Sequence, residues 1–141
     1  MKTFSLATLA SHMKELDICM MVTQGKRSGL NSRPMSNNKD VTYKGDSYFF
    51  TYEKSAKVKE LEANTSVSLI FEGKEDLFIS VMGKAKLIRN KNSFAEHWVD
   101  SLAQWFKDGI ETKGMVLIHV KATKIKYWQN EKQGEIAVGK K

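Results

Sequence analysis

The chain has 141 residues, of which 41% are hydrophobic and 28% are charged, and its formal net charge is +7. This length and composition are typical of one globular domain, so we expect residues 1–141 to fold around a single core. No apolar run approaches the roughly 18 residues that a membrane-spanning helix needs, which argues against a membrane protein.

The N-terminal segment and the cysteine content indicate a cytoplasmic location. Residues 1–16 carry serines, His12 and Glu15 where a secretory signal would need an uninterrupted apolar core. Cys19 is the only cysteine, so no internal disulfide can form. Its apolar neighbours in ICMMV favour a buried free thiol over a reactive one.

The positive charge does not by itself indicate nucleic-acid binding. There are 20 lysines but only three arginines, and the lysines are spread along the chain with no tract denser than KATKIK at 121–126. Specific nucleic-acid readers usually rely on arginine. We therefore expect no nucleic-acid partner.

The N-terminal half begins with a helix and continues with strands. Apolar residues at three- and four-residue steps predict one face of an amphipathic helix. Pro34 removes a ladder donor, so its strand is expected at a sheet edge or a bulge. The predicted elements are a helix over 5–16, a hairpin of 18–23 with 30–37, two strands within 40–52 around a turn at 44–46, and a helix over 55–63 ended by Asn64.

The C-terminal half repeats this mixture. Its predicted elements are a strand over 66–72, a long strand over 76–90 bent at Gly83, a helix over 91–106, a strand over 114–128 and a loose tail from about 130 to 141. Six or seven antiparallel strands against three helices favour a mainly β fold with flanking helices, namely a β-barrel rather than a parallel α/β sheet.

Three residues between the strand YFFT and the next helix could form an anion site. Thr51 ends the strand, Ser55 stands where the helix begins, and Lys57 lies in its first turn. A helix N-terminus offers unpaired N–H groups and the positive end of its dipole, which suits a phosphate. Spacing alone favours the simpler interpretation of an ordinary N-cap and a solvated lysine. We call Thr51, Ser55 and Lys57 the anion corner.

No other constellation of catalytic or metal-binding residues stands out. His12, His97 and His119 fall in three different predicted elements without metal-ligand spacing, which favours packing or surface roles. Neither Cys19 nor any serine has an identifiable catalytic base. Trp98, Leu102 and Trp105 are spaced to share one helix face, and core packing alone explains such a stripe.

Taken together, these motifs resemble the flavin-binding split barrels related to pyridoxamine 5′-phosphate oxidase, within their general stress protein branch. The resemblance covers nearly the whole chain and rests on the order and spacing of its pieces. These are the opening helix, SRPM at 32–35, YFFT at 48–51, SAKVKELEAN at 55–64, VSLIF at 67–71, VMGKAKLI at 81–88, the two-tryptophan helix and the closing YW.

The resemblance implies a six- or seven-stranded antiparallel split β-barrel that binds FMN. It places the FMN phosphate at the anion corner, with Arg33 also reaching toward the phosphate or the ring. It further implies a homodimer with two flavin sites at its interface, where the tryptophan helix closes over a flavin. The implied cofactor-binding residues are Ser32, Arg33, Pro34, Met35, Phe50, Thr51, Ser55, Lys57 and Trp105.

Two departures limit what the resemblance implies about activity. Full-length oxidases of the family have an arginine where this chain has Ala56, which removes one cation from the phosphate site. Their longer C-terminal segments complete a pyridoxal-phosphate pocket that this chain lacks, so vitamin oxidase activity is not expected. Flavin-dependent redox chemistry with a small-molecule donor and acceptor is the leading expectation, because the cofactor carries the electron chemistry.

Other functions and cofactors remain open at this point. The chain could carry or store flavin without turnover. The same fold could instead hold FAD, a deazaflavin or haem, although His119 is the only candidate axial ligand for haem.

Overall fold

The computed structural model describes residues 4–27, 29–36 and 43–138. Within these ranges the chain forms three α-helices and seven strands. The helices are α1 (Leu6–Met13), α2 (Ala56–Ala63) and α3 (Lys91–His97), and the strands are β1 (Ile18–Gly25), β2 (Gly29–Ser36), β3 (Asp46–Tyr52), β4 (Ser66–Glu72), β5 (Leu77–Ile88), β6 (Met115–Gln129) and β7 (Lys132–Ala137).

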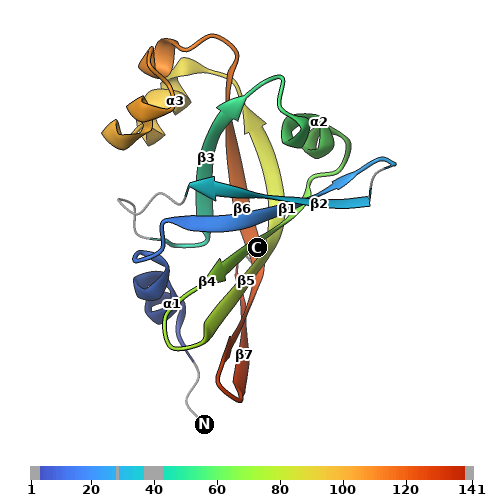
Figure 1. Ribbon diagram of the computed structural model, residues 1–141, viewed down its shortest axis with the longest axis vertical. Coiled ribbons are helices and arrows are strands. Elements are labelled where there is room, and N and C mark those ends of the chain that lie inside the picture. Colours follow the sequence, from blue (N-terminus) through green and yellow to red (C-terminus); the bar gives the residue numbers. More distant parts are fainter. Residues whose placement is uncertain (1–3, 28, 37–42, 139–141) are drawn as a thin grey trace.

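All seven strands belong to one antiparallel sheet with the order β2-β1-β4-β5-β6-β3, and β7 pairs with β6 outside this path. The 15-residue β6 organises the sheet, because its first half pairs with β3 and its second half pairs with β7. The strands curve around one another into a barrel (Figure 1). Because β2 and β3 stand at the two ends of the order, the barrel is split between them.

The pairing of β5 with β6 is irregular at Gly83. The pairing of β5 with β6 shifts register between Met82 and Gly83, which is the bend that the sequence predicts at this glycine. A Cβ atom at Gly83 would lie 2.3 Å from the carbonyl oxygen of Lys121. Glycine is therefore required for the close approach of the two backbones.

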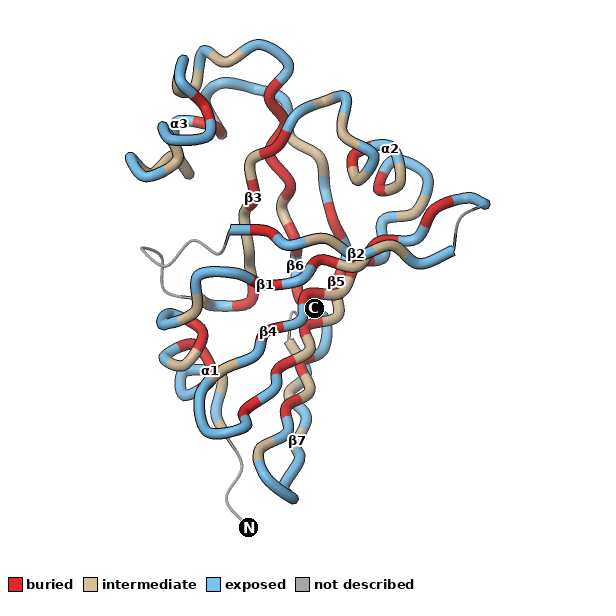
Figure 2. The backbone as a smooth tube through the Cα atoms, in the orientation of Figure 1, coloured by how far each residue is buried: buried red, intermediate tan, exposed pale blue. Residues whose placement is uncertain are grey.

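The barrel interior holds the main core. Alternate residues of β4 and β5, such as Leu69, Phe71, Ile79 and Val81, are fully buried, as strand periodicity requires. Figure 2 shows buried positions alternating with exposed or intermediate ones along the strands. A second, smaller cluster packs α3 and the segment after it onto one end of the sheet; its buried members are Phe94, Phe106, Met115 and Leu117.

The hairpin of β1 and β2 confirms the expected role of Pro34. The two strands pair antiparallel from Ile18↔Ser36 to Gly25↔Gly29, and β2 has no strand on its other side in the sheet order. A missing N–H is tolerated on such an edge. The predicted strand before Lys44 lies largely at 40–42, outside the described residues, and Tyr43 belongs to no strand.

The expectation of a loose C-terminal tail is wrong for residues 132–137, which form β7. A tight turn with Asn130 at φ 58° leads into β7, and Gln129↔Lys132 closes the hairpin. Asn is one of the few residues that tolerate this left-handed conformation. Ile136, within this short polar strand, and Val138, just after it, pack against the main core, and the strand pairs with β6 along its whole length.

The single helix predicted over 91–106 is also wrong. α3 ends at His97, Trp98 and Val99 are extended, and a 3₁₀ helix follows over Asp100–Gln104. The aromatic and β-branched residues at this point are poor helix formers. The break separates Trp98, which joins the second core cluster, from Trp105, which is 60% exposed. The two tryptophans therefore do not share a helix face.

Candidate functional site

A cleft of about 750 Å³ lies between the two ends of the sheet. Residues 34–36 of β2 form one side and residues 48–52 of β3 form the other. The segment 97–106, which we call the wall segment, covers the cleft with His97, Val99, Ser101, Leu102, Gln104, Trp105 and Phe106. Because β2 and β3 do not pair with each other, the split in the barrel positions this cleft. Its size suits a cofactor or small substrate.

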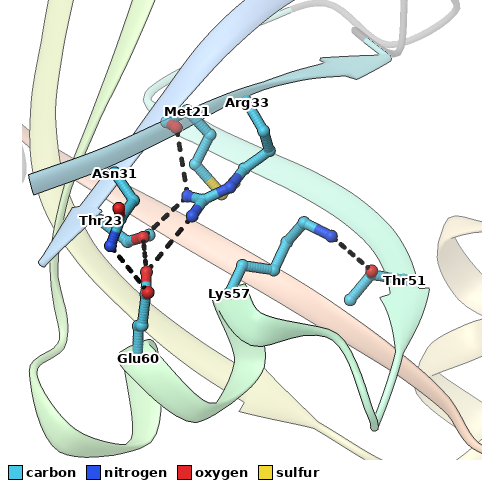
Figure 3. Close-up of polar contacts among 7 residues, drawn as sticks. All are labelled: Met21, Thr23, Asn31, Arg33, Thr51, Lys57 and Glu60. Carbon is cyan, nitrogen blue, oxygen red and sulfur yellow. Dashed lines mark hydrogen bonds and ion pairs between the residues drawn. The ribbon is translucent and has the colours of Figure 1, made fainter. Parts of the chain in front are cut away.

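The anion corner lies at one end of the cleft. Thr51 is buried in β3, and Lys57 points from the first turn of α2 so that its Nζ donates to Thr51 Oγ1 at 3.0 Å (Figure 3). Both residues line the cleft. Burial and the nearby positive charge of Arg33 lower the pKa of Lys57 below its ordinary value. A partly desolvated ammonium beside a second cation is favourable for binding an anion.

Ser55 completes this corner with an unused hydroxyl. It is the N-cap residue of α2, with extended backbone at φ −69° and ψ 150°, but its side chain makes no capping hydrogen bond. Its Oγ is buried and has no partner among the described residues. A buried hydroxyl without a partner is costly, so this atom is a candidate contact for a bound ligand. The ordinary N-cap expected from spacing alone is therefore not what the structure shows.

Arg33 lies beside the corner but is held by protein groups. Its Nη1 donates to Thr23 Oγ1 at 2.7 Å and to the Met21 carbonyl at 3.2 Å, and its Nη2 pairs with Glu60 Oε1 at 3.2 Å. It does not line the cleft. This pairing leaves no local signal in the sequence, because Glu60 is 27 residues away along the chain.

The other predicted residues divide between the cleft and the surface. Pro34, Met35, Phe50 and Trp105 line the cleft, whereas Ser32 does not. Ser32 is exposed and does not line the cleft, although Pro34 and Ser36, which lie on the same side of β2, do. Of the nine predicted site residues, the cleft therefore contains Pro34, Met35, Phe50, Thr51, Lys57 and Trp105.

The far end of the cleft holds an aromatic stack that the sequence did not reveal. The ring of Tyr48 lies between His97 and His119, with ring centroids 3.7 and 4.5 Å apart. His119 Nε2 is 2.8 Å from Asp46 Oδ1. Burial and the carboxylates of Asp46 and Glu96 raise the pKa of Tyr48, so its hydroxyl stays protonated. The alternation of Tyr48, Phe50 and Tyr52 along β3 was the signal available in the sequence.

No group of three or more metal-ligating side chains occurs in the described part of the chain. None of the helices in the described ranges is long and apolar enough to cross a membrane. The ammonium of Lys57 and the hydroxyl of Thr51 in the cleft suit an organic ligand with an anionic group.

Comparison with known proteins identifies the family. The model described as "Pyridoxamine 5'-phosphate oxidase like" matches residues 5–141. The chain belongs to this family. The split between β2 and β3 can therefore be compared with the folds of other family members.

Solved structures show the same fold. A protein related to general stress protein 26 from Clostridium acetobutylicum is 18% identical, with a TM-score of 0.82 over 94% of each chain. General stress protein 26 from Bacillus anthracis is 20% identical, with a TM-score of 0.73 over 91% of this chain and 94% of that one. The general stress FMN/FAD binding protein of Xanthomonas citri is 23% identical, with a TM-score of 0.71 over 96% and 92%.

These comparisons confirm the predicted family and the split-barrel fold class. No curated protein matches the sequence at a significant level.

Proposed function

We propose that the protein binds FMN in the cleft, with the phosphate at the anion corner. The observation that carries this proposal is the partly buried Lys57, which lies at one end of an aromatic-lined cleft and has a lowered pKa. A phosphate dianion would supply the counter-charge that Lys57 lacks and an acceptor for the Ser55 hydroxyl. Related structures described as FMN/FAD binding and FMN binding support the choice of a flavin.

The protein residues then have distinct roles around the cofactor. Bound FMN supplies hydride or electron transfer. Lys57 and Thr51 in the cleft lining hold its phosphate, and the buried Ser55 hydroxyl at the start of α2 adds a contact to it. Phe50 of β3 and Met35 of β2 provide apolar surface in the cleft. The wall segment restricts water through Leu102, Trp105 and Phe106, which keeps the local dielectric low.

We infer a flavin-dependent oxidoreductase whose donor and acceptor are small molecules. Pyridoxamine phosphate oxidation itself is not proposed. Flavin carriage or storage is the alternative function, and FAD or a deazaflavin is the alternative cofactor. Haem is disfavoured, because His119 is bonded to Asp46 and does not line the cleft.

A homodimer is part of the proposal. Ile18 and Met20 of β1, Ile70 of β4, Phe78 of β5 and Trp128 of β6 are each between 37% and 51% exposed. Met20 pairs with Ile70 and Phe78 pairs with Trp128, so these residues form one outer apolar face. Ile18 also lines the cleft, so this face is continuous with the flavin site. A second copy of the chain is the occupant that fits.

The buried free thiol of Cys19 accords with a reducing cytoplasmic location.

A titration of the purified protein with FMN, FAD and riboflavin, followed by flavin absorbance and fluorescence, tests the cofactor assignment. Tight FMN binding with at least about tenfold weaker riboflavin binding is expected, because riboflavin lacks the phosphate. Equal affinity for the two would contradict the assignment of the phosphate to the anion corner. Oxidation of NADH or NADPH by the FMN-loaded protein would support a redox role over flavin storage.

A further inference from the structure

The carboxylate of Glu60 is the centre of a polar network beside the anion corner. Thr23 Oγ1 donates to Glu60 Oε1, and Asn31 Nδ2 donates to Glu60 Oε2 at 2.8 Å (Figure 3). Arg33 Nη2 lies 3.2 Å from the same Oε1 atom. Glu60 therefore joins the second turn of α2 to both strands of the β1–β2 hairpin.

This network is shielded from solvent. The side chains of Arg33 and Glu60 are only 20% and 15% exposed, so their attraction is screened less than that of a surface pair. Arg33 is also close enough to Lys57 to lower its pKa. Without Glu60, the neighbouring cations Arg33 and Lys57 would lose the carboxylate that neutralises Arg33.

Arg33 has the position and the spare donor to contact a phosphate. It lies two residues before Met35 on the same side of β2, and Met35 lines the cleft, whereas Arg33 lies just beyond the lining. Its protein contacts use only the terminal nitrogens, and its Nε–H has no partner among the residues that the structure describes. A guanidinium contacts phosphate through several N–H groups at once, so a carboxylate that occupies part of it reduces this contact.

We propose that Glu60 sets the strength of phosphate recognition by competing with the phosphate of FMN for Arg33. The inference rests on the proposed function, and Glu60 itself does not touch the cofactor. Glu60 stabilises the free protein by neutralising Arg33, and the same neutralisation weakens the preference for FMN over riboflavin. Cofactor affinity and the stability of the cofactor-free fold therefore change in opposite directions at this residue.

The variant Glu60→Gln separates these two effects, because it keeps the shape and the acceptor oxygen but removes the charge. We expect FMN to bind about three- to tenfold more tightly, riboflavin to bind as before, and the Tm of the cofactor-free protein to fall. Glu62→Gln is the matched control, since Glu62 lies on the same helix but pairs with the exposed Arg89. It should leave both flavin affinities unchanged.

A double-variant cycle tests the mechanism. The gain in FMN affinity from Glu60→Gln should fall to within about twofold when Arg33 is already replaced in Arg33→Gln. Weaker or unchanged FMN binding by Glu60→Gln, or an equal gain without Arg33, would overturn the proposal. If Glu60→Gln folds poorly, Glu60→Asp is the second variant, because its shorter side chain withdraws the charge from Arg33. It should produce a smaller gain in FMN affinity. The absence of any gain in this variant would contradict the proposal equally.

Lys57→Met distinguishes this proposal from the proposed function. Loss of FMN affinity in Lys57→Met, combined with no gain in Glu60→Gln, rejects the role of Glu60 and leaves the phosphate site in place. Equal FMN and riboflavin affinities in the wild-type protein, unaltered by Lys57→Met, reject the phosphate site itself.

Discussion

At the scale of single residues, the anion corner combines a lysine whose charged form is disfavoured with a buried hydroxyl that makes no hydrogen bond within the described residues. The neighbouring Arg33 and the partial burial of Lys57 both disfavour its charged form. The Ser55 hydroxyl is buried without a partner in the described part of the chain. Both features cost stability in the free protein, and a bound anion would relieve both. Each therefore predicts a measurable property of FMN binding.

The lowered pKa of Lys57 predicts a pH-dependent preference for FMN over riboflavin. Only the charged ammonium attracts the phosphate, so the ratio of the two affinities should be constant from above the second pKa of the phosphate, about 6, up to the onset of Lys57 deprotonation. The ratio should decrease as pH rises through the pKa of Lys57 in the free protein, beginning below the range of an ordinary lysine. Titrations with both flavins at each pH measure this affinity ratio. In the variant Lys57→Met the ratio should no longer decrease with pH. A ratio that stays constant in the wild-type protein would contradict the role of Lys57.

The variant Ser55→Ala should affect ligand binding more than stability. Because the side chain makes no capping hydrogen bond, its loss should change the free energy of unfolding by less than about 0.5 kcal/mol, while FMN affinity should fall by about tenfold. Asn90→Ala is a matched control, because Asn90 Oδ1 accepts a hydrogen bond from the Ser93 N–H at 2.8 Å. That variant should cost about 1 kcal/mol and leave FMN binding unchanged. Denaturant unfolding and flavin titration give both values. A stability loss in Ser55→Ala as large as that in Asn90→Ala would contradict this assignment.

At the scale of elements, the position of the cleft depends on how β5 and β6 bend. The pairing register of β5 and β6 shifts at Gly83, where the two backbones are too close together to leave room for a side chain. The first half of β6 can then pair with β3, whose aromatic residues form one side of the cleft. A defect in this bend should therefore reduce both stability and flavin binding.

Gly83→Ala is expected to destabilise the protein by at least about 2 kcal/mol, because its Cβ would lie 2.3 Å from a backbone oxygen. Gly73→Ala is the matched control at the end of β4: its Cβ would meet Leu77 at 3.6 Å, an ordinary contact distance. That variant should cost less than about 1 kcal/mol. Urea unfolding of both proteins measures the difference. Equal stability of the two variants would show that the sheet can open at Gly83 without cost.

At the scale of the whole molecule, the outer apolar face and the cleft are parts of one surface. Ile18 belongs to both, and Trp105, which forms part of the wall segment, is 60% exposed. A single chain thus leaves apolar surface exposed beside the proposed cofactor. Pairing with a second copy would cover it and restrict solvent at the site.

Ile70→Asp should convert the proposed dimer to monomers, because it places a charge at the centre of the outer apolar face. The side chain is 42% exposed, so the monomer itself should remain folded. Size-exclusion chromatography with light scattering measures the mass, and circular dichroism monitors folding. Leu30→Asp is the control: Leu30 is 73% exposed on β2, outside this face, and the variant should remain dimeric. A monomeric wild-type protein at micromolar concentration would contradict the dimer.

Local sequence patterns predicted much of the fold. Alternation indicated most strands, Pro34 indicated an edge, Gly83 indicated the bend, and helical spacing indicated α1 and α2. Each of these signals acts within a few residues, so no knowledge of distant partners was needed. The two wrong elements had weak local signals: β7 is short and mostly polar, and the periodic spacing at 91–106 concealed the break at Trp98.

The sequence by itself determined the fold class, the family and the anion corner, because Thr51, Ser55 and Lys57 lie within seven residues on one strand–helix connection. Only the tertiary structure decided which groups compete for Arg33 and which rings face the cleft. Glu60 meets Arg33, and His97 and His119 meet across Tyr48, through contacts between distant elements. Such contacts depend on sheet register and on the path of the chain after α3, and neither leaves a periodic signal in the sequence.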